Sequence, residues 1–113
     1  MADRTLYAAA THIASFRQSE NAALTYAIEW SGLHNDVATS AWEVTDGDGT
    51  VTGAALSGNR TRVTISSGGT GWTTVTNRIT TDSGQTDERQ IRVDVQNNEQ
   101  GYRGDAYTGP RWY

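Results

Sequence analysis

Apolar and polar residues alternate along several short segments of this chain, and this alternation constrains its fold more than any other feature. In the clearest segment, residues 24–30, one face carries Leu24, Tyr26, Ile28 and Trp30. A period of two residues is typical of β-strands with one buried face. Helical periodicity does not occur, so the sequence predicts an all-β protein.

Turn-forming residues separate the alternating segments. Six strands are expected, at residues 24–30, 38–45, 50–52, 60–66, 72–81 and 89–95. Turns spaced by about 8–12 residues are typical of antiparallel β-sandwiches. A seventh strand can lie between Thr5 and Phe16, although Ala8–Ala10 could equally begin a short helix or an extended arm. We therefore expect an antiparallel sandwich of six to seven strands with extended N- and C-terminal arms.

The alternation also predicts which side chains face the core. They are Trp42, Val44, Thr61, Val63, Ile65, Val75, Asn77, Ile79, Ile91, Val93 and Val95. Asn77 is the polar exception, and a buried amide must find hydrogen-bond partners, for which backbone groups of a loop are expected. Trp42 lies in a predicted strand where immunoglobulin-like folds often bury a tryptophan, which favours that architecture.

Length and composition narrow the possible roles. The 113 residues suffice for one domain, which we divide into an N-terminal arm or edge strand at 1–22, a sandwich at 23–95 and a C-terminal arm at 96–113. The chain has no cysteine for a disulfide or a thiolate site. A net charge of −4 removes the usual basis for binding nucleic acid. No segment approaches the apolar length that crosses a bilayer, and the N-terminus does not resemble a signal peptide, so no membrane partner is expected.

Polar clusters in the sequence favour turns over catalysis. Ser31, His34 and Asp36 share one short loop and cannot adopt the geometry of a catalytic triad from there, so we interpret them as a polar turn. Neither His34 nor His12 has a second ligand at a spacing typical of a metal site. We therefore expect no enzyme activity and no bound metal.

Two glycine-rich clusters also have a structural interpretation. Residues 46–49 begin like a calcium loop, but the twelfth position is Ser57 where that loop needs a glutamate, so a hairpin turn is expected. Residues 68–71 precede a β-type segment and not a helix, which excludes a typical phosphate cradle and favours an inter-strand connection. No cofactor is expected.

All nine cationic residues of the chain are arginines. Five of them are in or beside predicted strands: Arg60, Arg62, Arg78, Arg89 and Arg92. They could form one basic surface if their strands were neighbours. Because the chain also contains 13 acidic residues, cross-strand ion pairs on solvated faces are the preferred interpretation.

Three segments carry a resemblance to a known family. Residues 24–30, the turn 67–71 and above all residues 75–93, with their Thr-Asn-Arg-Ile-Thr-Thr and Gly-Gln-Thr-Asp-Glu-Arg sequences, resemble the small tailed-bacteriophage proteins called fiber-tail adaptors. The resemblance covers roughly residues 23–95. Family members commonly have an aromatic residue, often Tyr, at the position of Trp72.

The resemblance implies an immunoglobulin-like structural protein of the virion tail. Such a protein would be made in the host cytoplasm, be present in several copies and bridge the tail tube or nozzle to tail fibres. The aromatic C-terminal arm cannot form a core of its own, and large aromatics dominate interface energies. The expected protein-interface residues are Tyr102, Arg103, Tyr107, Arg111, Trp112 and Tyr113.

Two other roles remain open at this point. A head-decoration protein of the same phage has no sequence feature that separates it from a tail protein. A carbohydrate-binding or adhesion sandwich would need several aromatic rings aligned on one exposed face, whereas Tyr26, Trp30 and Trp42 are predicted to face inward.

Overall fold

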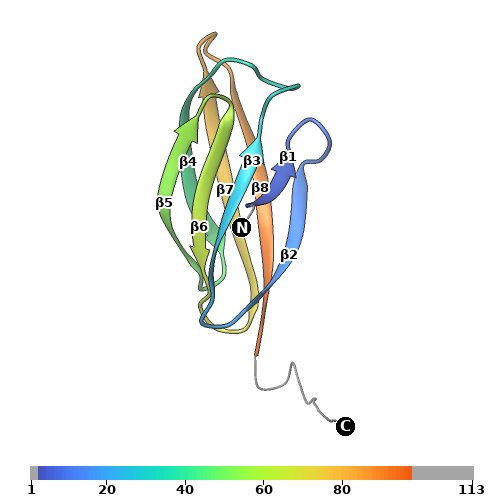
Figure 1. Ribbon diagram of the computed structural model, residues 1–113, viewed down its shortest axis with the longest axis vertical. Helices are drawn as coiled ribbons and strands as arrows, with labels where there is room; N and C mark the ends of the chain where they lie inside the picture. The colour runs from blue at the N-terminus through green and yellow to red at the C-terminus, as the bar shows by residue number, and fades with distance from the viewer. Residues whose placement is uncertain (1–2, 98–113) are drawn as a thin grey trace.

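The computed structural model describes residues 3–97 of the chain. Within this range the fold is all-β and consists of eight strands (Figure 1). They are β1 (Arg4–Tyr7), β2 (Ile13–Ser19), β3 (Ala23–Glu29), β4 (Val37–Asp46), β5 (Thr50–Ser57), β6 (Arg60–Ser66), β7 (Gly71–Thr81) and β8 (Thr86–Gln96). The described residues contain no helix, and therefore no helix able to span a membrane.

The strands form two four-stranded sheets that pack face to face as a β-sandwich (Figure 1). The first sheet has the order β1-β3-β6-β5, and the second has the order β2-β8-β7-β4. The expected antiparallel pairing holds for β3 with β6, β5 with β6, β4 with β7, and β7 with β8.

Both sheets are mixed, so the prediction of a wholly antiparallel sandwich was wrong at two places. β1 pairs with β3 in parallel, and β2 pairs with β8 in parallel. No hairpin fixes the direction of either N-terminal strand, because the chain crosses from one sheet to the other between β1 and β2. Each strand instead adds to a sheet edge beside a strand that is distant in sequence.

Residues 4–19 contribute two strands to the sandwich, which brings the strand count to eight instead of six to seven. Leu6 and Ala8 are buried in the core, and Phe16 packs against it from β2. Gln18 is also buried. Sequence alternation through Ala14, Phe16 and Gln18 follows the same period of two as the later strands.

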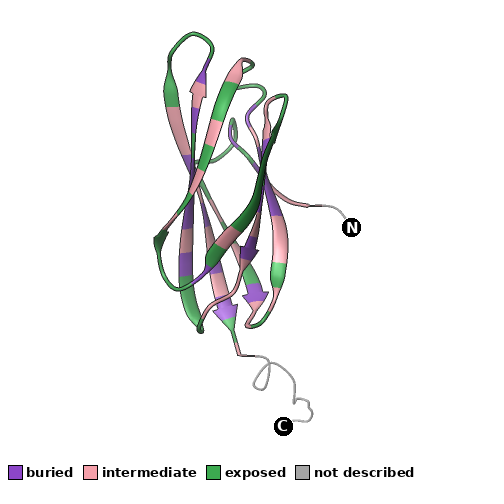
Figure 2. Cartoon of the chain, turned by 90° about the vertical axis from the view of Figure 1, so that its left-hand side faces the viewer, coloured by how far each residue is buried: buried purple, intermediate pink, exposed green. Residues whose placement is uncertain are grey.

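The core lies between the sheets and uses the faces that the alternation predicted. Thr61, Val63 and Ile65 of β6 are buried, as are alternate residues of β8 from Ile91 to Val95 (Figure 2). Trp30 is the largest fully buried side chain. Trp42 is only half-buried and packs against the rim of this core, because its strand β4 lies at the edge of the second sheet.

Residues 46–49 form a turn, but not the hairpin that was expected. They connect β4 of the second sheet to β5 of the first, so the turn carries the chain between the two layers. Gly47 has a φ of 90°, and a Cβ built on it would lie 2.4 Å from the carbonyl oxygen of Trp72. Glycine is needed here because β7 leaves no room for a side chain.

Asn77 connects the two sheets by hydrogen bonds and does not fix a loop as expected. Its Oδ1 accepts hydrogen bonds from Trp30 Nε1 at 3.0 Å and from Thr61 Oγ1 at 2.8 Å, both in the opposite layer. Its Nδ2 donates to Ser40 Oγ and to the carbonyl oxygen of Ala41 in neighbouring β4. The buried amide is therefore fully hydrogen-bonded, as burial in an apolar core requires.

Candidate protein interface

Trp72 is a large aromatic side chain that the fold leaves on the surface. Its side chain is 46 % exposed, near the start of β7. The register of β7 and β8 places Thr74 opposite Arg92, so that Arg92 is diagonal to Trp72. The Cζ atom of Arg92 lies 4.4 Å from the centre of the Trp72 ring. A guanidinium at this distance makes a cation–π contact that holds both side chains in place.

A shallow hollow of about 260 Å³ lies beside this pair. It is lined by Ser15, Phe16 and Arg17 of β2, by Trp72 and by Asp94 of β8. The pairing of Ser15 with Arg92 and of Arg17 with Asp94 brings these side chains together across β2 and β8. We call Ser15, Arg17, Trp72, Arg92 and Asp94 the Trp72 face.

A second hollow of about 190 Å³ is also lined by residues of the second sheet. Its lining comes from β4, β7 and β8 and includes Arg78 and Glu88, which form an ion pair. This part of the surface is polar, and its one arginine is paired with an acidic residue. The Trp72 face differs, because neither Arg17 nor Arg92 forms an ion pair within residues 3–97.

The Trp72 face has the chemistry of a protein-binding surface. Tryptophan and arginine are the residues most enriched among those that dominate binding energy at interfaces. The contact with Arg92 orders the indole before any partner arrives, which lowers the entropy lost on binding. Sequence reasoning placed Trp72 only at the start of a strand, although its alternation with the inward residues Val75, Asn77 and Ile79 already indicates that its ring faces outward.

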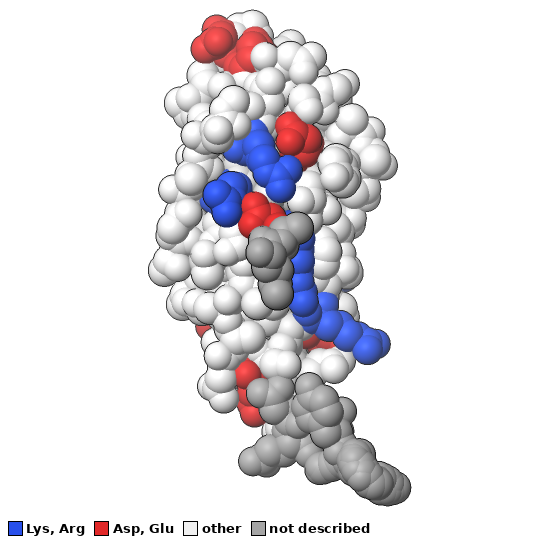
Figure 3. Space-filling view, viewed as in Figure 1, with Lys and Arg blue, Asp and Glu red and all other residues white. Residues whose placement is uncertain are grey.

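The five strand arginines do not form one basic surface. Arg60 and Arg62 pair with Asp3 on the first sheet, and Arg60 also pairs with Glu29 at 3.4 Å. Figure 3 shows basic and acidic side chains next to one another on one face of the molecule. Arg78 likewise pairs with Glu88, so the ion-pair interpretation is confirmed for three of the five arginines.

Two of the five arginines depart from that interpretation. Arg92 stacks on Trp72 and has no ion pair within residues 3–97. Arg89 pairs with Asp87, but it is buried and not on a solvated face. It donates two hydrogen bonds to the carbonyl oxygen of Ala8 and lies 5.4 Å from the Trp30 ring centre.

The polar loop after β3 is a turn and not a catalytic triad. Ser31 Oγ donates to Glu29, and Asp36 accepts a hydrogen bond from Ser83. His34 Nε2 lies 2.9 Å from Asp87 Oδ2. The three residues thus bind to different partners, which confirms the turn interpretation.

Asp87 has a perturbed carboxyl group. Partial burial alone would raise its pKa, but the hydrogen bonds from His34 and from the backbone N–H of Glu88, with the charge of Arg89, outweigh this effect. The pKa of Asp87 therefore lies below its ordinary value of 3.8. His34, Asp87 and Arg89 therefore form one interacting group that connects the loop after β3 to the start of β8.

Among residues 3–97, no group of three or more His, Asp or Glu side chains is placed to hold a metal ion. The six expected interface residues of the C-terminal arm, from Tyr102 to Tyr113, lie outside the described residues.

The fold is similar to that of several solved structures. The cysteine protease inhibitor EhICP2 from Entamoeba histolytica superimposes with a TM-score of 0.55 at 10 % identity, over 82 % of this chain and 94 % of the inhibitor. An endo-fucoidan hydrolase of glycoside hydrolase family 107, MfFcnA4, gives a TM-score of 0.52 at 14 % identity, over 78 % of this chain and 13 % of the hydrolase. At such identities the likeness shows the fold alone.

Comparison of sequences gives the family. No curated protein sequence matches the chain significantly. The model of the family described as podophage GP4 fiber-tail adaptor protein gp77 matches residues 18–94, which is more than half of the chain. This match contains the segments that resembled fiber-tail adaptors, all of β3 to β7 and most of β8. The chain therefore belongs to the podophage GP4 fiber-tail adaptor protein family.

Proposed function

We propose that this chain joins tail fibres to the tail tube or nozzle of a tailed phage, in several copies per particle and after synthesis in the host cytoplasm. The observation that carries the proposal is the family match over residues 18–94. The family is one of structural phage proteins and not of enzymes, and membership implies contact with other proteins of the virion tail.

We further propose that the sandwich is immunoglobulin-like. The orders β1-β3-β6-β5 and β8-β7-β4 correspond to the two sheets of that fold, with β2 added beside β8. The parallel pairing of β1 with β3 departs from the usual antiparallel arrangement. A rigid sandwich of this kind suits a connector, because it transmits load between partners without changing shape.

The contacts to partners are assigned to two parts of the chain. The Trp72 face offers an ordered aromatic and arginine pair on the second sheet. The C-terminal arm supplies Tyr102, Tyr107, Trp112 and Tyr113, with Arg103 and Arg111 as polar partners. We assign contacts to both parts because an adaptor must bind two proteins at once.

A carbohydrate-binding role has less support. A sandwich that stacks sugars on its surface needs several aromatic rings aligned on one exposed face. Within residues 3–97 the exposed aromatic rings are Tyr7 and Trp72, which belong to different sheets. A head-decoration role has no specific observation in its favour.

Imaging of the assembled particle tests the adaptor proposal. Electron cryomicroscopy of virions, with and without an antibody fragment raised against this chain, should place it between the tail tube or nozzle and the fibres. A head protein labelled by a second fragment is the matched control. Density for the antibody on the capsid surface would assign the chain to head decoration and overturn the proposal.

A further inference from the structure

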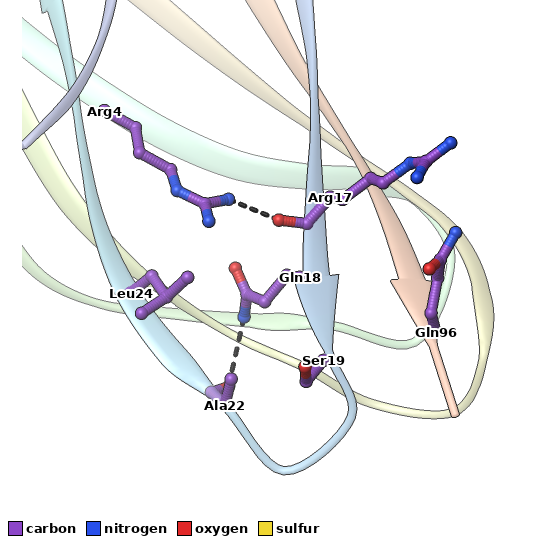
Figure 4. A pocket seen from close by; sticks show the side chains of 7 residues that line it. All are labelled: Arg4, Arg17, Gln18, Ser19, Ala22, Leu24 and Gln96. Carbon is purple, nitrogen blue, oxygen red and sulfur yellow. Dashed lines mark hydrogen bonds between the residues drawn. The ribbon is translucent and has the colours of Figure 1, made fainter. Parts of the chain in front are cut away.

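One edge of β3 is only partly covered. β1 has four residues and pairs with β3 from Tyr26 to Glu29. Over Ala23–Thr25, no strand within residues 3–97 pairs with this edge. A pocket of about 300 Å³ opens beside it, between the two sheets (Figure 4). The pocket is lined by Arg4, Arg17, Gln18, Ser19, Ala22, Leu24 and Gln96.

Arg4 is held in a fixed position in this pocket. Its Cζ atom lies 5.5 Å from the ring centre of Tyr26 and 5.9 Å from that of Phe16. One guanidinium nitrogen donates to Tyr26 Oη at 3.0 Å and to the carbonyl oxygen of Arg17. The contacts on rings and backbone orient the cation without neutralising it.

The partner of Arg4 is itself anchored. Tyr26 Oη donates to Gln18 Oε1 at 2.7 Å. The amide nitrogen of Gln18 donates to the carbonyl oxygen of Ala22, in the connection before β3, and to that of Ile65 in β6 of the opposite sheet. Because Gln18 and Tyr26 are both buried, this network is rigid and presents the guanidinium in one orientation.

Arg4 has no carboxylate partner within residues 3–97. Arg60, Arg62, Arg78 and Arg89 all form ion pairs there, but Arg4 does not. Figure 4 shows that the guanidinium of neighbouring Arg17 points away from Arg4. Within residues 3–97, the hydrogen bonds of Arg4 to Tyr26 and Arg17 use one of its nitrogens, whereas a guanidinium has five N–H donors in a fork that matches a carboxylate.

We propose that this pocket binds an extended acidic segment of another virion protein. An Asp or Glu side chain of the segment pairs with Arg4, and its backbone runs along β3 at Ala23–Thr25. Strand addition at an open sheet edge is a common mode of peptide recognition, in which backbone hydrogen bonds give affinity and a side-chain pocket gives specificity. The inference rests on the proposed function for the source of the segment.

Photo-crosslinking in the virion tests this inference. The phage is propagated in cells that supply the chain with Ala23→p-benzoylphenylalanine, and purified virions are irradiated and analysed by peptide mass spectrometry. The expected crosslink joins position 23 to another virion protein, within a few residues of an Asp or Glu. Adding Arg4→Met should lower the crosslink yield by at least about tenfold, as expected when one member of a desolvated charge pair is lost.

Two further variants keep the test specific. Arg62→Met removes an equal charge from the outer side of the first sheet and should leave the yield unchanged, because Arg62 pairs with Asp3. Arg4→Lys keeps the charge but not the fork and should give an intermediate yield, and thermal melting checks that each variant folds. If unmodified chain is missing from purified tails, the proposed function fails.

Other results overturn the inference alone. With the chain present in tails, the inference fails if no crosslink forms or if the crosslinked segment lacks acidic residues. It also fails if the crosslink maps to residues 98–113 of this protein, or if Arg4→Met and Arg62→Met give equal yields.

Discussion

Trp30 Nε1 donates a hydrogen bond of 3.0 Å to Asn77 Oδ1 across the interior, from one sheet of the sandwich to the other. Both side chains are fully buried. In a chain without cysteine, this contact and the neighbouring bond from Thr61 align the two layers by hydrogen bonding. Directional bonds at the centre of an apolar core fix the position of one sheet on the other, which apolar packing alone does less strictly.

Asn77→Ala should therefore destabilise the sandwich strongly. The substitution leaves the Trp30 indole N–H and the Thr61 hydroxyl buried without their acceptor, at about 1–3 kcal/mol for each group. We expect the free energy of unfolding to fall by about 3 kcal/mol or more, measured by urea denaturation. Thr52→Ala, at an exposed site of β5, is the control and should change it by less than about 0.5 kcal/mol. A loss below about 1 kcal/mol for Asn77→Ala would contradict the role assigned to the amide.

The two core tryptophans should differ in their contributions. Trp30→Ala removes a fully buried ring and should cost about 3–5 kcal/mol. Trp42→Ala should cost less because its ring is half-buried at the edge of the second sheet. Trp42 Nε1 has no hydrogen-bond partner among residues 3–97, so Trp42→Phe should be nearly neutral. Denaturant melts of the three variants check this order, and a larger loss for Trp42→Ala than for Trp30→Ala would reverse it.

Trp72→Ala should weaken assembly without affecting folding. The ring is about half exposed, so its removal changes the core little, but it takes away the centre of the Trp72 face. We expect the amount of chain incorporated into purified tails to fall by at least about tenfold, since truncation of an interface hot spot costs 2 kcal/mol or more. Tyr7→Ala removes an exposed ring from the other sheet and serves as the matched control. Equal incorporation of the two variants would exclude the Trp72 face as an interface.

Removal of residues 98–113 should leave a folded domain that no longer assembles. Every residue of the described core cluster lies between Leu6 and Val95, so the truncated chain keeps all of them. Thermal melting should remain cooperative with a midpoint within a few degrees of the full chain, whereas incorporation into tails should be lost. If cooperativity disappears instead, the C-terminal aromatics belong to the core of the domain.

Stability should depend on the ionisation of Asp87 at acid pH. Because the pKa of this carboxyl is lower in the folded chain than its ordinary value of 3.8, the ionised group stabilises the fold above that pH. The contribution is lost as the pH falls through the folded-state pKa. Unfolding free energies measured from about pH 6 to about pH 2 should therefore fall less steeply for Asp87→Asn than for the unmodified chain. Parallel pH profiles for the two proteins would show that Asp87 has no such role.

The N-terminal strands could be predicted from the sequence only in part. Residues 13–19 alternate like the later strands, with Ala14, Phe16 and Gln18 inward, and this signal was available. No such signal indicated that β1 pairs in parallel with β3 and β2 in parallel with β8. The direction of an edge strand depends on its neighbour in the folded sheet, which here is far away in the sequence. The same limit applies to the turn at 46–49, whose residues predict a tight turn equally well within one sheet or between two.

The amino-acid sequence by itself determined the all-β class, the inward faces of β6 and β8 and the likeness to fiber-tail adaptors. These features depend on side-chain period and on turn residues, which act over short distances along the chain. Only the tertiary structure decided that Arg92 lies over the Trp72 ring, that Asn77 joins the sheets and that Arg4 has no acidic partner among residues 3–97. Each of these outcomes depends on groups that are far apart in sequence and meet only when both sheets have packed.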